Sequence, residues 1–238
     1  MPYDLTGKRA IVTGASRGLA AAIKAAFEAA GAKVYAPSRG EFNLADSTVP
    51  ARMWFRAGGK LDILVNNAAV IGPMGPAETN TLADWRECFQ VNLFTPMQLC
   101  ALAVANMKAS KTKGSIINIS GGGACNPRPG FSAYATSKCG LVRFSETVAE
   151  ECREFGIRVN CVSPGAMDTR LGAADITTNK EREFADPALA AQLVTFLASD
   201  ASRPITGKLI SAVWDPWPEL ERNLSKGADM YTLRRVTP

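Results

Sequence analysis

Arg9-Ala-Ile-Val-Thr13-Gly14-Ala-Ser-Arg-Gly18-Leu-Ala20 is the stretch that decides the fold, because an apolar run passes through a glycine-rich turn into an alanine-rich segment. Arg9–Thr13 predicts a buried strand, and Leu19–Ala30 predicts an amphipathic helix. Glycines at such a turn let the backbone approach a phosphate, and the helix amino terminus supplies N–H groups and a positive dipole. The stretch therefore predicts a dinucleotide site at Gly14, Ser16, Arg17, Gly18 and Leu19.

Short apolar runs continue to alternate with longer amphipathic stretches along the chain. Further strands are expected at Lys33–Ala36, Leu61–Val65, Ser115–Ile119 and Val159–Val162, and long helices at Leu82–Ala109 and Ser132–Phe155. This alternation predicts an α/β fold, a doubly wound and mostly parallel sheet flanked by helices, in one domain spanning residues 1–238. Its ligand is expected at the carboxyl ends of the strands.

The connection after the second strand is short. Only residues 37–60 separate that strand from the next, and Glu41-Phe-Asn-Leu44 follows Arg39 almost at once. A parallel crossover needs about a dozen residues, so an outer third strand and its helix are predicted to be missing or reduced. One short helix is expected around Thr48–Arg56. A full helix between residues 38 and 42 would contradict this prediction.

Charge and composition exclude several classes of function. The 27 basic and 22 acidic residues are interspersed, so the net charge of +5 indicates no arm for nucleic acid and no membrane patch. Histidine is absent, which excludes His-dependent triads and His-containing zinc sites. The amino terminus lacks a signal pattern and no 18 apolar residues run together, so a soluble cytoplasmic protein is expected. The six cysteines favour small buried thiols over disulfides.

Tyr134-Ala-Thr-Ser-Lys138 places a phenol and an ammonium on the same face of a predicted helix. A nearby cation favours the phenolate, and the same lysine has the reach to hold a ribose hydroxyl. Taken alone, the spacing is more typical of an exposed amphipathic pair. Other segments must therefore decide whether the pair performs proton transfer.

The end of the second strand bears on the choice of cofactor. Ala36-Pro-Ser-Arg39 offers no acid to a ribose 2′-hydroxyl, whereas Arg39 and Arg17 together suit a 2′-phosphate, with Ser38 beside them. The pattern favours NADP. NAD is not excluded, because the acid Glu41 is close in sequence to Arg39. The alternative for the two arginines is that both are ordinary solvated surface residues.

From Lys8 to about Gly207 the chain resembles the short-chain dehydrogenases/reductases. The matching motifs are Thr13-Gly14-x-x-x-Gly18-Leu-Ala20, Asn66-Asn67-Ala68-Ala69, Asn92, Ser115 to Ser120, Tyr134-x-x-x-Lys138 and Ser163-Pro164-Gly165. The resemblance implies a Rossmann-like fold and an NAD(P)-dependent oxidoreductase that interconverts a secondary alcohol and a ketone. The alternative is a non-catalytic dinucleotide-binding regulator of the same fold.

The resemblance also implies roles for four residues. Tyr134 is expected to be the general acid/base, and Lys138 to lower the pKa of that phenol and bind the nicotinamide ribose. Asn92 is expected to hold a water that links Lys138 to solvent. The substrate-orienting serine of the family lies one residue nearer the tyrosine than Ser120 does, at Gly121. Either Ser120 takes this role after a local shift, or backbone N–H groups do.

Further cofactor contacts are implied by the same resemblance. Asn66 and Ala68 would close a strand end against the cofactor, and Pro164 and Gly165 would turn the chain around the nicotinamide. Met167 and Thr169 would pass its carboxamide, and Asn43 and Leu44 would contact the adenine, although the family commonly has an acid where Asn43 stands.

The substrate is expected to be a small molecule covered by the loop from Asp168 to Asp186. Thr177-Thr-Asn-Lys-Glu-Arg182 lacks large apolar side chains, which indicates either a polar, sugar-like substrate or a solvated loop. A homodimer or homotetramer is expected through the two long helices. The divergent tail after Gly207 is a lid, an oligomer arm or surface packing.

Overall fold

The computed structural model describes residues 3–167, 184–225, 227 and 229–233. Across these residues, six strands form one sheet in the order β2-β1-β3-β4-β5-β6, and each neighbouring pair is parallel. The strands are β1 Arg9–Val12, β2 Lys33–Tyr35, β3 Ile63–Asn66, β4 Ser115–Ile119, β5 Arg158–Ser163 and β6 Leu209–Ser211. The predicted α/β, doubly wound architecture is confirmed.

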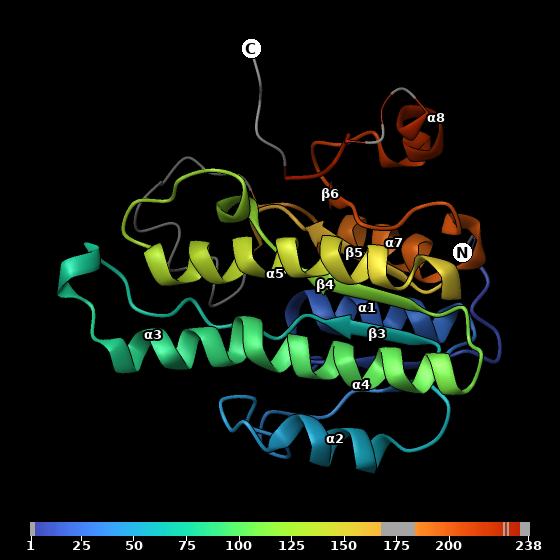
Figure 1. Ribbon diagram of the computed structural model, residues 1–238, viewed down its shortest axis with the longest axis horizontal. Coiled ribbons are helices and arrows are strands. Elements are labelled where there is room, and N and C mark those ends of the chain that lie inside the picture. Colours follow the sequence, from blue (N-terminus) through green and yellow to red (C-terminus); the bar gives the residue numbers. More distant parts are fainter. Residues whose placement is uncertain (1–2, 168–183, 226, 228, 234–238) are drawn as a thin grey trace.

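Helices cover both faces of the sheet (Figure 1). One face carries the adjacent helices α1 and α7, and the other carries α4 and α5, with α2 packed against α4. The helix bounds are α1 Gly18–Ala29, α2 Val49–Ala57, α3 Leu82–Phe89, α4 Thr95–Ala109, α5 Ser132–Glu151, α7 Pro187–Ala198 and α8 Leu220–Leu224. This three-layer arrangement gives the sheet a core on each side.

The central strands are apolar along their whole length because both of their faces are buried. All five residues of β4 are buried, as are all four of β3. Ile117 and Ile119 belong to the core under α1 and α7, while Ile116 belongs to the core under α4. This alternation follows from the two-residue period of a strand, and it explains why β4 was predicted with its observed bounds.

The predicted loss of the outer strand is confirmed. β2 is an edge of the sheet, and residues 36–48 contain neither helix nor strand. The short helix expected around Thr48–Arg56 is α2 Val49–Ala57, with Pro50 in its first turn. Met53 of this helix is fully buried and packs with Leu99 and Ala103 of α4 in the same core. α2 therefore closes the layer where a longer crossover would have run.

The helix expected over Leu82–Ala109 is continuous but changes its winding in the middle. A π-helical turn, Gln90–Phe94, joins α3 to α4, and Pro96 lies in the first turn of α4. Proline has no backbone N–H, so Pro96 cannot donate the usual i→i−4 bond to the carbonyl of Asn92. The helical segment Leu82–Ala109 is long and apolar enough to cross a membrane. Buried core helices of soluble proteins meet the same criterion of length and composition.

Three elements of the fold were not predicted from periodicity: α7, β6 and the short α8. α7 is rich in alanine and leucine all round, so it has no polar stripe, but its start carries a clear signal. Asp186 Oδ1 accepts a hydrogen bond from Ala188 N at 2.8 Å, and Pro187 occupies the first turn. β6 is only three residues long and pairs with β5. Such a short run is indistinguishable from a loop by pattern.

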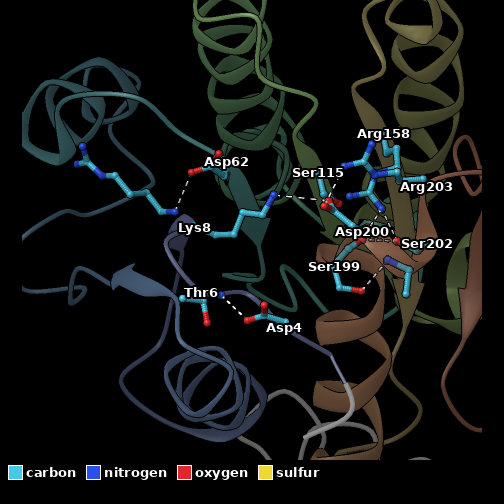
Figure 2. A network of polar contacts seen from close by, with 12 residues as sticks. Asp4, Thr6, Lys8, Asp62, Ser115, Arg158, Ser199, Asp200, Ser202 and Arg203 are labelled. Carbon is cyan, nitrogen blue, oxygen red and sulfur yellow. Dashed lines mark hydrogen bonds and ion pairs between the residues drawn. The ribbon is translucent and has the colours of Figure 1, made fainter.

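A polar network ties α7 to the amino-terminal ends of the strands, opposite the edge where a ligand is expected (Figure 2). Ser115 Oγ donates to Leu197 O at 2.8 Å, and Arg158 Nη1 donates to Ser199 O at 2.9 Å and also bonds Ser202. These donors satisfy carbonyls at the end of α7, which carry its negative dipole. Burial lowers the pKa of Arg158 to about 10, still far above neutrality, so the guanidinium remains charged.

The tail returns to the body of the protein through α5. Leu233 N donates to Glu146 Oε1 at 2.7 Å, and Arg143 Nη2 donates to Leu233 O at 2.5 Å. Arg143 and Glu146 also form an ion pair at 2.5 Å. These contacts hold the last described residues of the tail against α5.

Candidate active site

A cleft of about 1730 Å³ opens at the carboxyl ends of the strands, where a ligand was expected. Its walls come from the loops that follow β1 to β5, the amino-terminal half of α5 and the tail. Pockets for a single drug-sized molecule usually measure about 300 to 1,000 Å³. The volume suits a dinucleotide and a small substrate together.

The turn between β1 and α1 is shaped for close approach. Gly14 has φ of +76°, and a Cβ at this position would lie 3.1 Å from both Cα and Cβ of Ala68. Thr13 Oγ1 accepts hydrogen bonds from Asn67 N at 3.0 Å and Ala68 N at 3.1 Å, which fixes the turn against the end of β3. Glycine is therefore required at position 14 by both conformation and space. The five residues predicted from this turn, Gly14, Ser16, Arg17, Gly18 and Leu19, all line the cleft.

The segment after β2 presents one cation, Arg39, and no carboxylate to the cleft. Ser38 and Arg39 are exposed and line it, together with Arg17 of the phosphate turn. Glu41 is not among the lining residues, and its Oε1 instead accepts a hydrogen bond from Tyr35 Oη at 3.4 Å. Glu41, the acid that left the choice between NAD and NADP open in the sequence, therefore faces Tyr35.

Asn43 and Leu44, for which adenine contact is a prediction, line the cleft despite the shortened segment before them. Leu44 O accepts a hydrogen bond from Thr95 Oγ1 at 3.0 Å, so the start of α4 holds this segment in place. Phe42 and Met53 line the same end of the cleft. Neither was predicted as a site residue, because both read as core residues in the sequence.

Tyr134 and Lys138 share one face of α5 and both line the cleft. They are 5% and 2% exposed, so the pair is not the ordinary solvated pair that its spacing more often means. Lys138 Nζ lies 5.9 Å from the centre of the Tyr134 ring and donates to Ile119 O at 2.8 Å. Burial lowers the pKa of Lys138 to about 8 from its ordinary 10.5, because water is removed from the ammonium.

Ser120 and Gly121 follow β4 and both line the cleft beside α5. Ser120 is buried, and its Oγ has no hydrogen-bond partner within the described residues. A Cβ at Gly121 would lie 3.1 Å from Tyr134 Oη. The position next to the phenol oxygen is thus held by Gly121, while the Ser120 hydroxyl makes no bond to Tyr134.

Asn92 is fully buried and supports the cleft from behind rather than lining it. Its Oδ1 accepts from Val70 N at 2.9 Å, and its Nδ2 donates to Val70 O at 2.8 Å and Ser137 Oγ at 3.2 Å. The side chain therefore binds the loop after β3 to α5. Pro96, four residues further along the chain, has no N–H and therefore cannot donate a hydrogen bond to the main-chain carbonyl of Asn92.

Asn66 lies in the core and not on the cleft wall. Its Nδ2 donates to Asn118 Oδ1 at 2.8 Å, across adjacent strands, and it is 3% exposed. The neighbouring Asn67 and Ala68 do line the cleft. Asn67 was not predicted as a site residue. Because successive side chains of a strand point to opposite faces, the burial of Asn66 would have indicated that Asn67 points the other way.

The loop after β5 supplies the opposite wall. Pro164, Gly165 and Met167, for which nicotinamide contacts are a prediction, line the cleft, and Ala166 O accepts from Ala185 N at 2.7 Å. Thr169 and the loop segment Thr177–Arg182 lie outside the described residues. Arg128 and Trp214 also line the cleft and were not predicted, because each comes from a loop whose path no periodicity fixes.

A sequence model of the short chain dehydrogenase family matches residues 47–180. The chain belongs to the short-chain dehydrogenase family. A 3beta-hydroxysteroid dehydrogenase 1 of Eggerthella lenta is 32% identical to this short-chain dehydrogenase over 240 residues, covering 86% of the chain and 91% of the relative. A D-threitol dehydrogenase of Mycolicibacterium smegmatis is 33% identical over 241 residues, with 86% and 91% covered.

The fold agrees with solved members of the family. A protein of Beutenbergia cavernae, assigned as an NAD(P)-dependent gluconate 5-dehydrogenase with NADP bound at low occupancy, superposes with a TM-score of 0.81 at 29% identity. The match covers 89% of this short-chain dehydrogenase and 97% of that chain. The protein is therefore an oxidoreductase with a nicotinamide dinucleotide cofactor and a small-molecule substrate, which decides against a non-catalytic regulator.

The cleft of this short-chain dehydrogenase fits such a cofactor. Gly14 has no side chain that would keep a pyrophosphate from the backbone of the turn, and the cations Arg17 and Arg39 line the same cleft. Lys138, buried beside Tyr134, has its ammonium within the cleft where a ribose hydroxyl would lie. These polar and charged residues and the volume of the cleft fit a dinucleotide that lies across the carboxyl ends of the strands.

Proposed function

We propose that this enzyme interconverts a secondary alcohol and a ketone with NADP, using Tyr134 as the general acid/base. The observation that carries the proposal is the burial of Tyr134 and Lys138 side by side in the cleft, on one face of α5. A phenol that exchanges a proton with the substrate must be shielded and close to a positive charge.

Each residue of the pair has a distinct task in this proposal. Tyr134 Oη protonates the carbonyl oxygen during reduction and removes the hydroxyl proton during oxidation. Lys138 stabilises the phenolate by its charge and holds the nicotinamide ribose. When bound, the cofactor supplies or accepts the hydride.

The route by which the proton reaches solvent is proposed to pass Asn92. Its carboxamide is committed to Val70 and Ser137, so the group available to a water is its main-chain carbonyl. Pro96, lacking an N–H, leaves that carbonyl without the usual i+4 donor. Asn92 is thus proposed to act through its backbone while its side chain fixes the loop.

Ser120 is proposed to orient the substrate, and replacing it tests this role. Ser120→Ala is expected to lower kcat about tenfold, because one hydrogen bond to the reacting oxygen is lost. If Ser120→Ala lowers kcat less than about threefold, the orienting group is a backbone N–H instead.

NADP is proposed as the preferred cofactor because Arg39 and Arg17 line the cleft and Glu41 does not. Arg39→Ala is expected to weaken NADPH binding at least about tenfold, since a charge-assisted contact to the 2′-phosphate is lost. NADH binding should change less than about twofold. Titration of the protein fluorescence with each cofactor measures both constants, with the exposed Arg153→Ala as the matched control. Equal losses for the two cofactors would contradict a 2′-phosphate contact.

A polar, sugar-like substrate is proposed from the walls of the open end of the cleft. Asn126, Arg128, Asp215 and Thr232 line it, and Trp214, 83% exposed, offers a flat surface at the mouth. The D-threitol and gluconate 5-dehydrogenases similar to this chain bear names of polyhydroxylated substrates, and the hydroxysteroid dehydrogenase does not. A panel of sugar alcohols, sugar acids and steroids, each assayed with NADP⁺, compares the classes directly.

Association into a homodimer or homotetramer is proposed from the family resemblance, through the outer faces of α4 and α5. Light scattering on the purified protein gives its mass in solution. A mass equal to the 25.3 kDa of one chain would contradict the proposal.

A further inference from the structure

Trp214 is a large aromatic side chain that stands almost bare at the mouth of the cleft. It lines the cleft and is 83% exposed, and its indole makes no ring contact and no hydrogen bond within the part of the chain that the structure describes. An indole left in water forgoes the free energy that burial of its apolar area would give. Packing inside the chain therefore does not account for a tryptophan here.

The backbone that carries Trp214 is fixed by a closed set of hydrogen bonds. Ser211 Oγ accepts from Val213 N at 3.3 Å and from Trp214 N at 3.1 Å. In the opposite direction, Asp215 Oδ2 accepts from Ser211 N at 2.6 Å. The indole is thus presented on a rigid turn, and little backbone freedom is lost when a ligand covers it.

Both ends of this turn are anchored in the body of the protein. Ala212 is buried and its N donates to Ser163 O at 2.9 Å. Trp217 is buried, and its ring centre lies 5.9 Å from that of Phe196 on α7. The turn cannot leave the mouth of the cleft without breaking these contacts.

The turn borders the reacting end of the cleft on two sides. A Cβ at Gly165 would lie 2.7 Å from Val213 Cγ2, so the turn packs against the loop proposed to hold the nicotinamide. Burial raises the pKa of the Cys125 thiol, and Cys139 and the carboxylate of Asp215 raise it further by electrostatic repulsion. Asp215 therefore also lies near the loop after β4, where Cys125 lines the cleft.

Asp215 offers an unused acceptor beside the exposed indole. It is half-buried and lines the cleft, and only its Oδ2 has a hydrogen-bond donor among the described residues. Oδ1 is free to accept from a ligand, and a carboxylate binds hydroxyl donors more strongly than a neutral acceptor does. The same charge repels an anionic group placed next to it. Asp215 therefore suits a neutral ligand that carries hydroxyls.

The indole adds a requirement for shape. The face of an aromatic ring is negative, so it attracts the slightly positive C–H bonds of a saturated ring laid flat upon it. A cyclic polyol has such a C–H face and carries its hydroxyls around the edge. An open-chain polyol has no fixed flat face, and a flat hydrocarbon has no hydroxyls for Asp215. Only the cyclic polyol uses both side chains.

We propose that Trp214 and Asp215 bind a neutral cyclic polyol, a pyranose, furanose or cyclitol, with the indole on its C–H face and the carboxylate accepting from its hydroxyls. This inference rests on the proposed oxidoreductase function of the same cleft and narrows its polar substrate to a ring. The reacting ring carbon gives a hydride to NADP⁺ and its hydroxyl gives a proton to Tyr134, which leaves a ring ketone. Trp214 and Asp215 are thereby specificity-determining residues.

Ligand pairs that differ in ring closure test the proposal by binding. The pairs are myo-inositol with D-glucitol, 1,5-anhydro-D-glucitol with D-glucitol, and methyl β-D-xylopyranoside with xylitol. In calorimetric titration of the enzyme saturated with NADP⁺, at least one ring is expected to bind at least about tenfold more tightly than its open-chain partner. Trp214→Ala should remove this preference and Trp214→Phe should keep part of it. Phe55→Ala, which removes an aromatic ring 89% exposed on α2 outside the cleft, is the matched control and should change nothing.

Replacement of Asp215 tests the second contact separately. Asp215→Asn keeps an oxygen for Ser211 N, so the turn should survive, and it removes the charge. It is expected to weaken binding of the preferred ring by about fivefold, because charge-assisted hydrogen bonds are about twice as strong as neutral ones. Cyclohexanol, a ring with a single hydroxyl, serves as the reference ligand. An unchanged affinity for the preferred ring would mean that Asp215 does not touch it.

Quenching of tryptophan fluorescence by acrylamide reports directly on the indole. The difference between the parent and Trp214→Phe isolates the signal of Trp214, which the preferred ring should protect from the quencher. If Trp214 is already protected in the ligand-free protein, a second copy of the chain covers it and the proposal is wrong. If Trp214→Ala weakens NADPH binding by more than about threefold, the indole serves the cofactor, which also overturns the proposal.

These outcomes are distinguishable from failure of the proposed function. If no ring binds more tightly than its open-chain partner, or if Trp214→Ala keeps the preference, recognition of a ring by Trp214 is wrong even when open-chain alcohols are oxidised. If a ring binds through Trp214 and Asp215 but neither it nor any alcohol or ketone of a wider panel is turned over, the proposed reaction is what fails.

Discussion

Replacement of Tyr134 by phenylalanine is expected to lower kcat by about a thousandfold, because general acid/base catalysis by one positioned side chain contributes about 10² to 10⁴. The variant keeps the ring and loses only the hydroxyl. The ring is buried between Arg128 and Lys138, so its packing should survive. Single-turnover measurement of NADPH oxidation with a substrate found by the panel gives the rate of the chemical step.

A matched variant controls for loss of a phenol elsewhere. Tyr35→Phe removes a hydroxyl that bonds Glu41 outside the cleft, and it should retain kcat within about twofold. NADPH should bind Tyr134→Phe as it binds the parent, within about threefold. If Tyr134→Phe retains more than about a tenth of the parental kcat, the proton is transferred by another group.

Replacement of Lys138 by methionine is expected to have the second largest effect. Without the ammonium, kcat should fall by about two orders of magnitude, because the phenolate loses a buried positive charge and the ribose loses a ligand. The exposed Lys24→Met, on α1, is the control and should be neutral. Loss of NADPH affinity together with kcat would indicate both roles, whereas loss of affinity alone would contradict the effect on Tyr134.

The same variant should reveal the depressed pKa of Lys138 through protein stability. Below pH 8 both the folded and unfolded states hold the proton, and the buried ammonium destabilises the folded state. Between about pH 8 and 10.5 the folded state releases the proton while the unfolded state keeps it, so the free energy of unfolding rises with pH. The rise corresponds to on the order of 3 kcal/mol for this group.

Chemical denaturation of the cofactor-free protein from pH 7 to 10.5 measures this contribution. The parent is expected to gain stability relative to Lys138→Met across that window, at fixed protein concentration. A constant difference between the two proteins would show that the pKa of Lys138 is not depressed. At pH 7 the substitution Lys138→Met has two opposing effects on the free energy of unfolding. It removes a buried charge, which stabilises the folded state, and it leaves Ile119 O without its donor, which destabilises it.

The layout of the fold was predictable because buried parallel strands leave apolar runs that stand out from their surroundings. Ser115–Ile119 was predicted with its observed bounds, and the short connection after the second strand correctly indicated a missing outer strand. α7 and β6 were not predicted. An evenly apolar helix has no period to detect, and a three-residue strand depends on its partner β5 rather than on its own sequence.

Residues of the cleft wall were predictable where they sit on regular elements or directly at strand ends. Helical spacing placed Tyr134 and Lys138 on one face, the family resemblance pointed to them as a pair, and Gly14 follows from the turn that links β1 to α1. Asn66 was assigned to the cofactor, yet its side chain is turned into the core by strand alternation. Arg128 is brought over Tyr134 only by the fold of a proline-rich loop, which sequence spacing does not encode.

The absent outer strand leaves β2 as an exposed template for strand addition by another chain, a hazard that edge strands carry in general. β2 limits that hazard by its own construction. It is three residues long, it begins with the exposed Lys33, and Pro37, which has no N–H to donate, follows shortly after its end. Lengthening this edge or replacing Lys33 by an apolar residue would therefore favour aggregation through sheet-to-sheet pairing, even with the catalytic cleft unchanged.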